Sequence, residues 1–251
     1  MSSEKDLAIV LRVTEFSETS CVVLVFTRQF GKLSALAKGA RRPKSPFEAA
    51  LDVLAVCRIV FLHKSGDLLD LLTEARLERR FRSARSDLTR LYAGYYVAEL
   101  LDGLTDARDP HPELFDEAES ALRGLDQGAD VAVVVLRFEM AALHQLGHLP
   151  LLSECAACGG SVDSAERVAF GMLAGGLLCG RCRAGQRQVI AVRRETIDTL
   201  RAFSGDEQRP GQADDIPQRV RGELRGLVNQ YIAHLLGHRP KLHAYLGELT
   251  R

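Results

Sequence analysis

Four cysteines arranged as two close pairs constrain the fold of this chain more than any other feature. The pairs are Cys155-Ala-Ala-Cys158 and Cys179-Gly-Arg-Cys182, and twenty residues separate them. Within a C-x-x-C pair both sulfurs can turn toward one point, and a second pair completes the tetrahedron of thiolates that zinc prefers. Because protein ligands then fill all four positions, we predict one structural Zn²⁺ without catalytic chemistry. The alternatives are two disulfides or redox-active C-x-x-C motifs.

Length and composition indicate a soluble globular protein of two or three modules. The chain has 251 residues, of which 46% are hydrophobic and 26% charged. Its first residues lack the basic-then-apolar run of a signal peptide, and no stretch approaches the ~20 apolar residues of a membrane span. Cys21 and Cys57 lie in apolar segments, where we expect them to pack as small hydrophobic side chains. These features favour a cytoplasmic protein.

Charge is segregated along the chain although the net charge is zero. No acidic residue lies between Glu18 and Glu48. The basic residues of that interval are Arg28, Lys32, Lys38, Arg41, Arg42 and Lys44. A second acid-free interval, between Glu166 and Glu195, holds Arg181, Arg183, Arg187, Arg193 and Arg194. Acidic residues are concentrated instead between Asp102 and Asp130. The net charge of zero is therefore an average over the chain and is compatible with a basic surface on one part of it.

The first eighty residues predict a small β-barrel. Short runs rich in apolar and β-branched residues, separated by turns, predict five strands at residues 7–13, 21–27, 33–38, 52–62 and 68–77. Five consecutive strands in this length suit a closed barrel of the OB type. A small sandwich or an SH3-like barrel has the same periodicity, so these alternatives stay open.

The pattern changes to helical spacing after residue 86. Apolar residues at three-and-four spacing and helix-end signals predict helices at 88–100, 112–125, 129–146, 194–203 and 218–236, with a hairpin at 168–178. The predicted fold class is α+β: an N-terminal five-stranded OB-type β-barrel followed by an α-helical domain with an inserted C4 zinc module. The predicted domains are residues 1–80 (barrel), 81–150 with 188–251 (helical) and 151–187 (zinc module).

The basic interval after Glu18 predicts a nucleic-acid interface on the barrel. Lys and Arg side chains neutralise phosphates and release counterions, and OB barrels bind single strands beside such loops. We predict that Arg28, Lys32, Lys38, Arg41, Arg42 and Lys44 contact DNA. If all six did so on a single strand, the slope of log K against log salt would be about −4. The alternative is a solvated loop that confers only solubility.

Other candidate contacts are less specific. Phe16, Phe30 and Phe47 flank predicted turns and are candidates for stacking on bases, whereas Phe26 lies in an apolar strand and is expected in the core. A second basic element is interrupted by acids, which favours internal ion pairs; it comprises Arg76, Arg79, Arg80, Arg82, Arg85 and Arg90. Arg181 and Arg183 beside the second cysteine pair are candidates to extend the interface.

The sequence carries no convincing catalytic motif, and we predict that the chain is not an enzyme. Gly31-Lys32 lacks the glycine spacing and the following Ser or Thr of a P-loop. His144 and His148 lie four residues apart, but Gly147 ends the predicted helix between them, so we expect ordinary surface histidines.

Three segments together resemble the bacterial RecO family of DNA repair and recombination mediators. They are the barrel segment from Gly31 to Ser45, the helix with Tyr95-Tyr96-x-x-Glu99-Leu100, and Gly175-Gly176-Leu177-Leu178-Cys179 before the last cysteine pair. The resemblance implies binding to single- and double-stranded DNA and annealing of complementary strands. It implies association with RecR to help load RecA onto DNA coated by single-strand-binding protein (SSB), and docking of the SSB C-terminal tail in some members. A nucleoid-associated location follows from these roles.

The resemblance also implies site residues. Lys32, Lys38, Arg41, Arg42 and Lys44 match the family's basic barrel segment, and the four paired cysteines match its zinc ligands. The carboxyl end departs from the family pattern, with Lys241-Leu242-His243 in place of lysine-serine-arginine. Two other functions remain open: an RNA-binding OB and zinc-ribbon protein, and a non-catalytic assembly adaptor.

Overall fold

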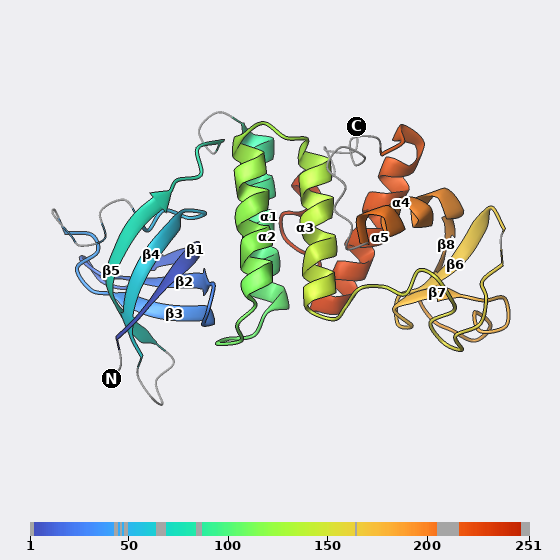
Figure 1. The fold of residues 1–251 in the computed structure, drawn as a ribbon, viewed down its shortest axis with the longest axis horizontal. Coiled ribbons are helices and arrows are strands. Elements are labelled where there is room, and N and C mark those ends of the chain that lie inside the picture. Colours follow the sequence, from blue (N-terminus) through green and yellow to red (C-terminus); the bar gives the residue numbers. More distant parts are fainter. Residues whose placement is uncertain are drawn as a thin grey trace. The chain divides into compact units, whose positions relative to one another are not determined.

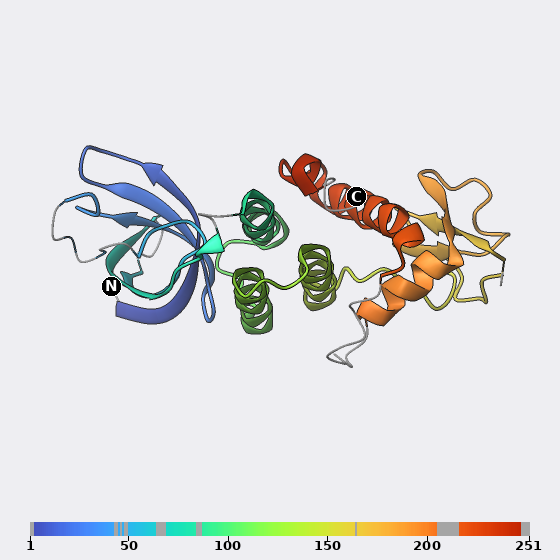
Figure 2. The same cartoon turned by 90° about the horizontal axis from the view of Figure 1, so that it is seen from above.

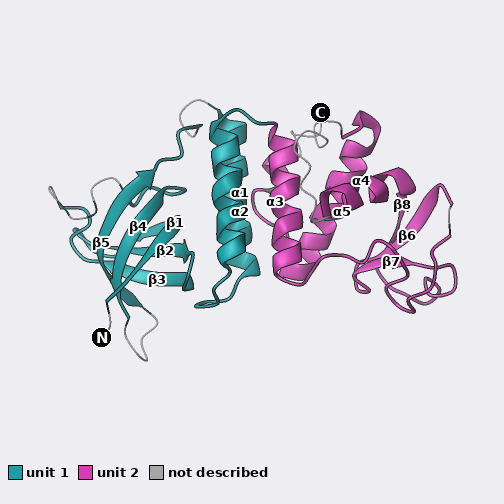
Figure 3. Cartoon of the chain, in the orientation of Figure 1, with its two compact units in different colours: residues 1–129 teal, residues 130–251 magenta. Residues whose placement is uncertain are grey.

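A computed structural model of the chain describes residues 3–42, 45, 47, 50–63, 69–83, 87–163, 165–204 and 216–246. It divides into two compact units, Met1–Ala129 and Asp130–Arg251 (Figure 3). Each unit has its own sheet and its own buried core, and each is described separately below.

Unit 1 contains a closed five-stranded barrel (Figure 1). Its strands are β1 (Ser3–Glu15), β2 (Cys21–Thr27), β3 (Gly31–Ala37), β4 (Val56–Leu62) and β5 (Asp70–Arg79). The order around the barrel is β1-β2-β3-β5-β4, and β4 closes it by pairing with β1. Neighbouring strands are antiparallel except for β3 and β5, which are parallel. The predicted OB-type barrel is therefore confirmed, because this is a closed Greek-key arrangement and not a sandwich.

Alternating side chains fill the barrel. Along β3, Leu33, Ala35 and Ala37 are buried, whereas Ser34 and Leu36 between them are partly exposed. This period of two turns one face of the strand into the core. The β1 register shifts between Val10 and Arg12, a bulge that lets one long strand bend and pair with both β2 and β4. Phe26, predicted as core, is fully buried.

Two helices complete unit 1. Asp87 caps the start of helix α1 (Leu88–Leu104), and its side chain accepts a hydrogen bond from the Arg90 amide at 3.1 Å. Helix α2 (Pro112–Asp126) begins with proline, whose fixed φ suits the first helical position. The ring of Phe115 on α2 stacks on that of Phe26 in the barrel, with centroids 6.4 Å apart. Apolar packing thus joins α2 to β2.

Gly31 allows the connection between α1 and α2 to approach the barrel. A Cβ at this position would lie 2.1 Å from the Asp109 carbonyl oxygen, and the Gly31 φ is +67°. The adjacent Arg108 amide donates to the Lys32 carbonyl at 2.9 Å. A side chain at residue 31 would clash with the connection between α1 and α2. Glycine is therefore needed here so that this connection can pack against the barrel.

Unit 2 combines helices with a small antiparallel sheet. Its elements are α3 (Val131–Gln145), β6 (Arg167–Gly171), β7 (Gly176–Leu178), β8 (Val189–Arg193), α4 (Arg194–Ser204), α5 (Gln218–Leu236) and α6 (His243–Leu246). The sheet order is β7-β6-β8. Helices α4 and α5 pack together and both contact β8, as Figure 2 shows from above. The sequence predicted the β6–β7 hairpin, but the third strand was not predicted.

Charged side chains of α5 fix the packing of unit 2. Glu223 accepts hydrogen bonds from the Thr196 hydroxyl at 2.6 Å and the Arg193 amide at 3.1 Å, and pairs with Arg167 at 3.0 Å. Arg225 forms a buried ion pair with Glu139 of α3. Helix α5 therefore contacts the sheet, α4 and α3 through charged side chains. Each of these charges has a partner of opposite charge, which offsets the cost of removing it from water.

The compact units do not follow the predicted domain boundaries at residues 80 and 150. Helices α1 and α2 group with the barrel, because α1 contacts β1 and α2 contacts β2. The predicted division into barrel, helical domain and zinc module stays a prediction. In the described segments, no helix is both long and apolar enough to cross a membrane.

Candidate metal centre and nucleic-acid interface

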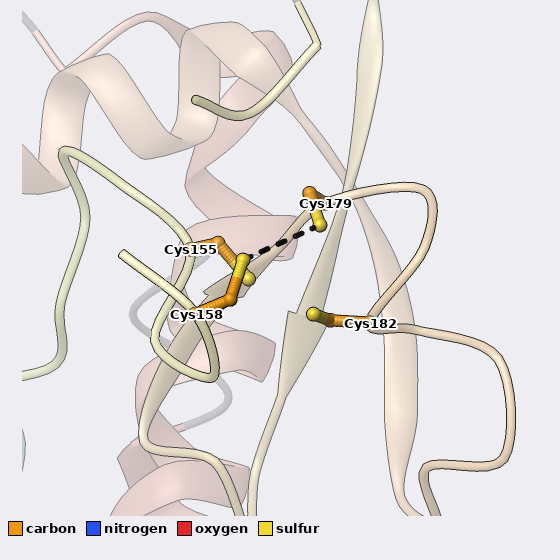
Figure 4. A group of neighbouring side chains, drawn as sticks. All are labelled: Cys155, Cys158, Cys179 and Cys182. Carbon is orange, nitrogen blue, oxygen red and sulfur yellow. Dashed lines mark hydrogen bonds between the residues drawn. The ribbon is translucent and has the colours of Figure 1, made fainter. Parts of the chain in front are cut away.

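Two backbone turns present the four cysteines. In the first, the Cys155 carbonyl accepts hydrogen bonds from the Cys158 amide at 3.3 Å and the Gly159 amide at 2.8 Å. The second begins at Cys179, directly after β7, and its carbonyl accepts from the Arg183 amide at 3.1 Å. Each turn brings the two sulfurs of one C-x-x-C pair to the same side, and the β6–β7 hairpin carries the second pair to the first (Figure 4).

The four sulfurs fit a single tetrahedral metal ion. All four lie within 4.8 Å of one another, and Cys158 Sγ is 3.9 Å from Cys179 Sγ. Zinc bound to four thiolates at ~2.3 Å requires sulfurs roughly 3.8 Å apart. All six cysteines of the chain lie in described segments, and none of them forms a disulfide in this structure. The predicted ligands therefore form a group that can hold one metal ion.

Local hydrogen bonds prepare the cysteines for a cation. Backbone hydrogen bonding at Cys179 outweighs burial and lowers the pKa of Cys155 to about 6. Backbone hydrogen bonding at Cys182 lowers the pKa of Cys179. In contrast, hydrogen bonding to Cys158 raises the pKa of Cys182 to about 12. These hydrogen bonds favour the thiolate at Cys155 and Cys179 and the protonated thiol at Cys182, and a bound cation favours the thiolate form of each ligand.

Buried glycine backbone supports the metal centre. A Cβ on Gly176 would lie 2.3 Å from the Leu151 carbonyl oxygen. That oxygen accepts from the Leu177 amide, and the Leu151 amide donates to the Gly175 carbonyl, both at 2.9 Å. The chain entering the first cysteine turn thus pairs with β7, which leads into the second. Residue 176 must be glycine for this close approach.

The predicted DNA-contact residues occupy two opposite ends of β3. Thr27 pairs with Gly31 at one end, and Cys21 pairs with Ala37 at the other. Six residue steps at ~3.3 Å separate these ends by roughly 20 Å. Arg28 and Lys32 lie at the first end, and Lys38, Arg41 and Arg42 lie at the second. The sequence interval is therefore not one continuous patch.

Arg28 and Lys32 have acidic partners on the helices of unit 1. Arg28 forms two hydrogen bonds with the Asp116 carboxylate, at 2.9 and 2.8 Å, which raise its own pKa and lower that of Asp116. Lys32, of which 14% is exposed, donates to the Asp102 carbonyl and lies 3.3 Å from the Asp102 carboxylate. Their predicted contact with DNA remains untested, and in this structure they join the barrel to α1 and α2.

Lys38, Arg41 and Arg42 form an exposed basic group, which we call the rim loop (residues 38–42). Lys38 and Arg42 are exposed and have no acidic partner among the described residues. Arg41 pairs with Glu15 at 3.0 Å, but both side chains are largely exposed. Such surface pairs contribute only ~0–1 kcal/mol, so a phosphate can replace the carboxylate. Lys44, the remaining predicted contact, lies outside the described residues.

The three phenylalanines that were candidates for stacking on bases differ in exposure. Phe47 is buried in the barrel core with 1% exposed, which excludes it from stacking on bases. Phe30 is partly buried against Phe61, with ring centroids 5.3 Å apart in an edge-to-face arrangement. Phe16 remains 63% exposed.

Sequence comparisons decide the family. The family model described as Recombination protein O N terminal matches residues 1–81, and the model described as Recombination protein O C terminal matches residues 85–243. The DNA repair protein RecO of Rhodopirellula baltica is 40% identical over 265 residues, covering 96% of this chain and 98% of that protein. The chain belongs to the RecO family. The DNA repair protein RecO of Myxococcus xanthus is 33% identical over 249 residues, covering 99% of both chains.

RecO family membership supports a role in DNA repair and recombination. It confirms the resemblance inferred from the barrel, helix and cysteine segments. For this RecO-family chain, Gly176 allows Leu151 to lie against β7, and Gly175 has a φ of +69°, a conformation that favours glycine.

In the second basic element of the RecO-family chain, Arg79, Arg80 and Arg90 have acidic partners, but only Asp87, the partner of Arg90, belongs to the same segment of the sequence. Arg79 pairs with Glu119 and Asp126, at 3.8 and 3.3 Å, and Arg80 pairs with Asp52 at 3.5 Å. Arg85 lies outside the described residues. Arg181 and Arg183 are exposed beside the metal centre, and their contact with DNA stays a prediction.

Proposed function

We propose that this protein is a recombination mediator that binds single- and double-stranded DNA and anneals complementary strands. The observation that carries the proposal is the rim loop, where Lys38 and Arg42 are exposed without an acidic partner among the described residues. Together with Arg41 they can neutralise successive phosphates at one end of an OB-type barrel. Three phosphate contacts give a slope of log K against log salt of about −2 on a single strand.

Annealing by such a surface requires no bond-making. Cations that contact two strands reduce the repulsion between them and keep them close until base pairs nucleate. Sequence selectivity then comes from base pairing. We therefore propose that annealing is non-enzymatic and requires neither a nucleotide cofactor nor a catalytic residue.

Family membership supports partner proteins for this activity. We propose that the protein acts with RecR and helps load RecA onto DNA coated by SSB, and that the SSB tail is a further candidate ligand. The bound metal is proposed to be one structural Zn²⁺ on Cys155, Cys158, Cys179 and Cys182, because four thiolates at tetrahedral spacing are its preferred closed site.

The test removes the rim-loop charges. The variant with Lys38, Arg41 and Arg42 changed to alanine is expected to bind a single-stranded oligonucleotide at least tenfold more weakly, with a smaller salt slope and slower annealing. Fluorescence anisotropy and a fluorescence annealing assay measure these quantities, with bare and SSB-coated strands.

A matched control removes three exposed arginines elsewhere in unit 1, namely Arg58, Arg76 and Arg123. This control keeps the same net charge as the rim-loop variant and is expected to retain most of the affinity. Equal losses in both variants would contradict a localised site, and full binding by the rim-loop variant would refute its assignment.

A further inference from the structure

Phe16 is the exposed aromatic side chain of the described part of unit 1. It is 63% exposed, and the other large apolar side chains exposed in that part are Val13 and Leu88, neither of which is aromatic. Leaving a phenylalanine ring in water forgoes the stabilisation that its burial would give. An isolated exposed apolar residue needs no explanation by itself, so its surroundings decide what it means.

Hydrogen bonds define the backbone turn around Phe16. The Phe16 and Ser17 amides both donate to the Ser20 carbonyl at 3.1 Å, which closes a tight turn between β1 and β2. Glu15 and Cys21, immediately outside the turn, form the last pair of the β1–β2 ladder. The ring is therefore presented from a fixed turn at the barrel end, which limits the entropy lost on binding a ligand.

The same turn is joined to the rim loop. The Arg41 amide donates to the Thr19 carbonyl at 3.0 Å, and the Gly39 amide donates to the Ser20 hydroxyl at 3.3 Å. The strand register agrees, since Cys21 pairs with Glu15 on one side and with Ala37 on the other. An exposed aromatic ring and the exposed cations thus share one end of the barrel.

We propose that Phe16 stacks on a base of a single strand whose phosphates contact the rim loop. The inference rests on the proposed DNA-binding function and adds a residue that selects single strands. In a duplex both faces of each base are already stacked, whereas an unpaired base offers a free π face. Glu15 and Glu18 flank Phe16 and repel phosphates, so the attraction at this turn comes from the ring.

The experiment compares wild-type protein with Phe16→Ala on two ligands with identical phosphates. One is an oligothymidylate, and the other is the same length of abasic tetrahydrofuran chain. We expect Phe16→Ala to weaken binding of oligothymidylate by about fivefold to a hundredfold, as loss of one stacked base does. Binding of the abasic chain and of duplex, and the salt slope, are expected to stay unchanged. Leu88→Ala, which truncates another exposed apolar residue of unit 1, is the control.

A second variant provides a direct signal. The chain has no tryptophan, so Phe16→Trp introduces a single indole at the proposed contact. We expect this variant to bind oligothymidylate at least as tightly as wild type, with its fluorescence quenched by oligothymidylate and not by the abasic chain. Retained affinity also shows that the turn tolerates substitution.

The outcomes separate this inference from the proposed function. If the wild-type protein bound no single-stranded DNA, both the proposed DNA-binding function and the stacking role of Phe16 would be wrong. Salt-dependent binding by wild type with no loss in Phe16→Ala would sink the stacking role alone. Equal losses on the abasic chain and on oligothymidylate would show that Phe16 supports the loop structurally and contacts no base.

Discussion

The ion pair between Arg41 and Glu15 places a carboxylate in competition with any phosphate at the rim loop. The two side chains are 46% and 77% exposed, and 3.0 Å separates the Arg41 Nη1 and Glu15 Oε1 atoms. Water and salt screen an exposed pair of this kind, so it is exchanged at little cost. Glu15 therefore tunes the affinity of the rim loop without blocking it.

We predict that Glu15→Gln strengthens single-strand binding by about twofold to fivefold at low salt, because it removes a competing negative charge. The gain should fade as salt is raised, since screening weakens the competition. Anisotropy titrations over a salt series measure both effects. Glu78→Gln, which removes a carboxylate paired with Arg58 on the barrel, is the control. Weaker binding by Glu15→Gln would show that Glu15 positions Arg41.

At the residue scale, sequence reasoning succeeded where local chemistry decides and failed where distant partners decide. The cysteine spacing predicted which four side chains come together as a group that can hold one metal ion, because each turn is local. Burial of Cys57 was also predicted, and burial raises the pKa of its thiol to about 12. The acidic partners of Arg28 and Lys32, in contrast, lie 88 and 70 residues away along the chain. The absence of acidic residues from a segment of sequence does not predict which carboxylates from other parts of the chain will lie beside it in the fold.

Glu223 on α5 links three elements of unit 2 and illustrates control at the scale of the element. Its carboxylate accepts hydrogen bonds from Thr196 on α4 and from the amide of Arg193 at the end of β8. Burial acts to raise its pKa, but these hydrogen bonds and the charges of Arg167 and Arg193 outweigh burial and lower it. The ionised form is therefore the one that the fold stabilises.

We predict that Glu223→Gln lowers the free energy of unfolding of unit 2 by about 1–2 kcal/mol near neutral pH. A lowered pKa in the folded state gives stability that is present above the ordinary value of ~4.3 and is lost as pH falls through the folded value. The difference between wild type and variant should thus shrink in acid. Denaturant titrations over a pH series measure it. A difference that stays constant in acid would contradict the role of the charge.

The elements themselves were largely predictable from local signals. Predicted helices at 112–125 and 218–236 match α2 and α5 to within one residue at each end, since Pro112 starts one and Gly237 ends the other. The strand β8 was missed because its five residues directly precede a helix and carry no turn signal. Barrel closure depends on pairing between β1 and β4, which no local pattern specifies.

At the scale of the whole molecule, two units with separate cores carry separate parts of the proposed function. The rim loop and Phe16 belong to unit 1, and the cysteine cluster belongs to unit 2. The division into barrel, helical domain and zinc module stays a prediction, and the compact units group the elements by spatial contact. Helices α1 and α2 group with the barrel through contacts such as Phe26 with Phe115, which periodicity cannot reveal.

We predict that Cys179→Ser loses the bound metal and lowers the thermal transition of unit 2 by about 5 °C or more, because metal binding contributes directly to folding. Zinc analysis and calorimetry measure both effects. Single-strand affinity through the rim loop should fall less than threefold, since that loop lies in unit 1. Cys21→Ser, at a buried cysteine outside the cluster, should retain zinc. A metal-free variant of full stability would exclude a structural role.

The path of the chain through the two cysteine turns has a consequence for the stability of unit 2. Cys155 and Cys182 bracket the β6–β7 hairpin, so an ion held by both turns ties the start of this segment to its finish. Such a tie restricts the unfolded chain as a cross-link does, yet it is reversible and responds to chelation. The thermal stability of unit 2 should therefore rise with the free concentration of the metal ion that the four cysteines bind.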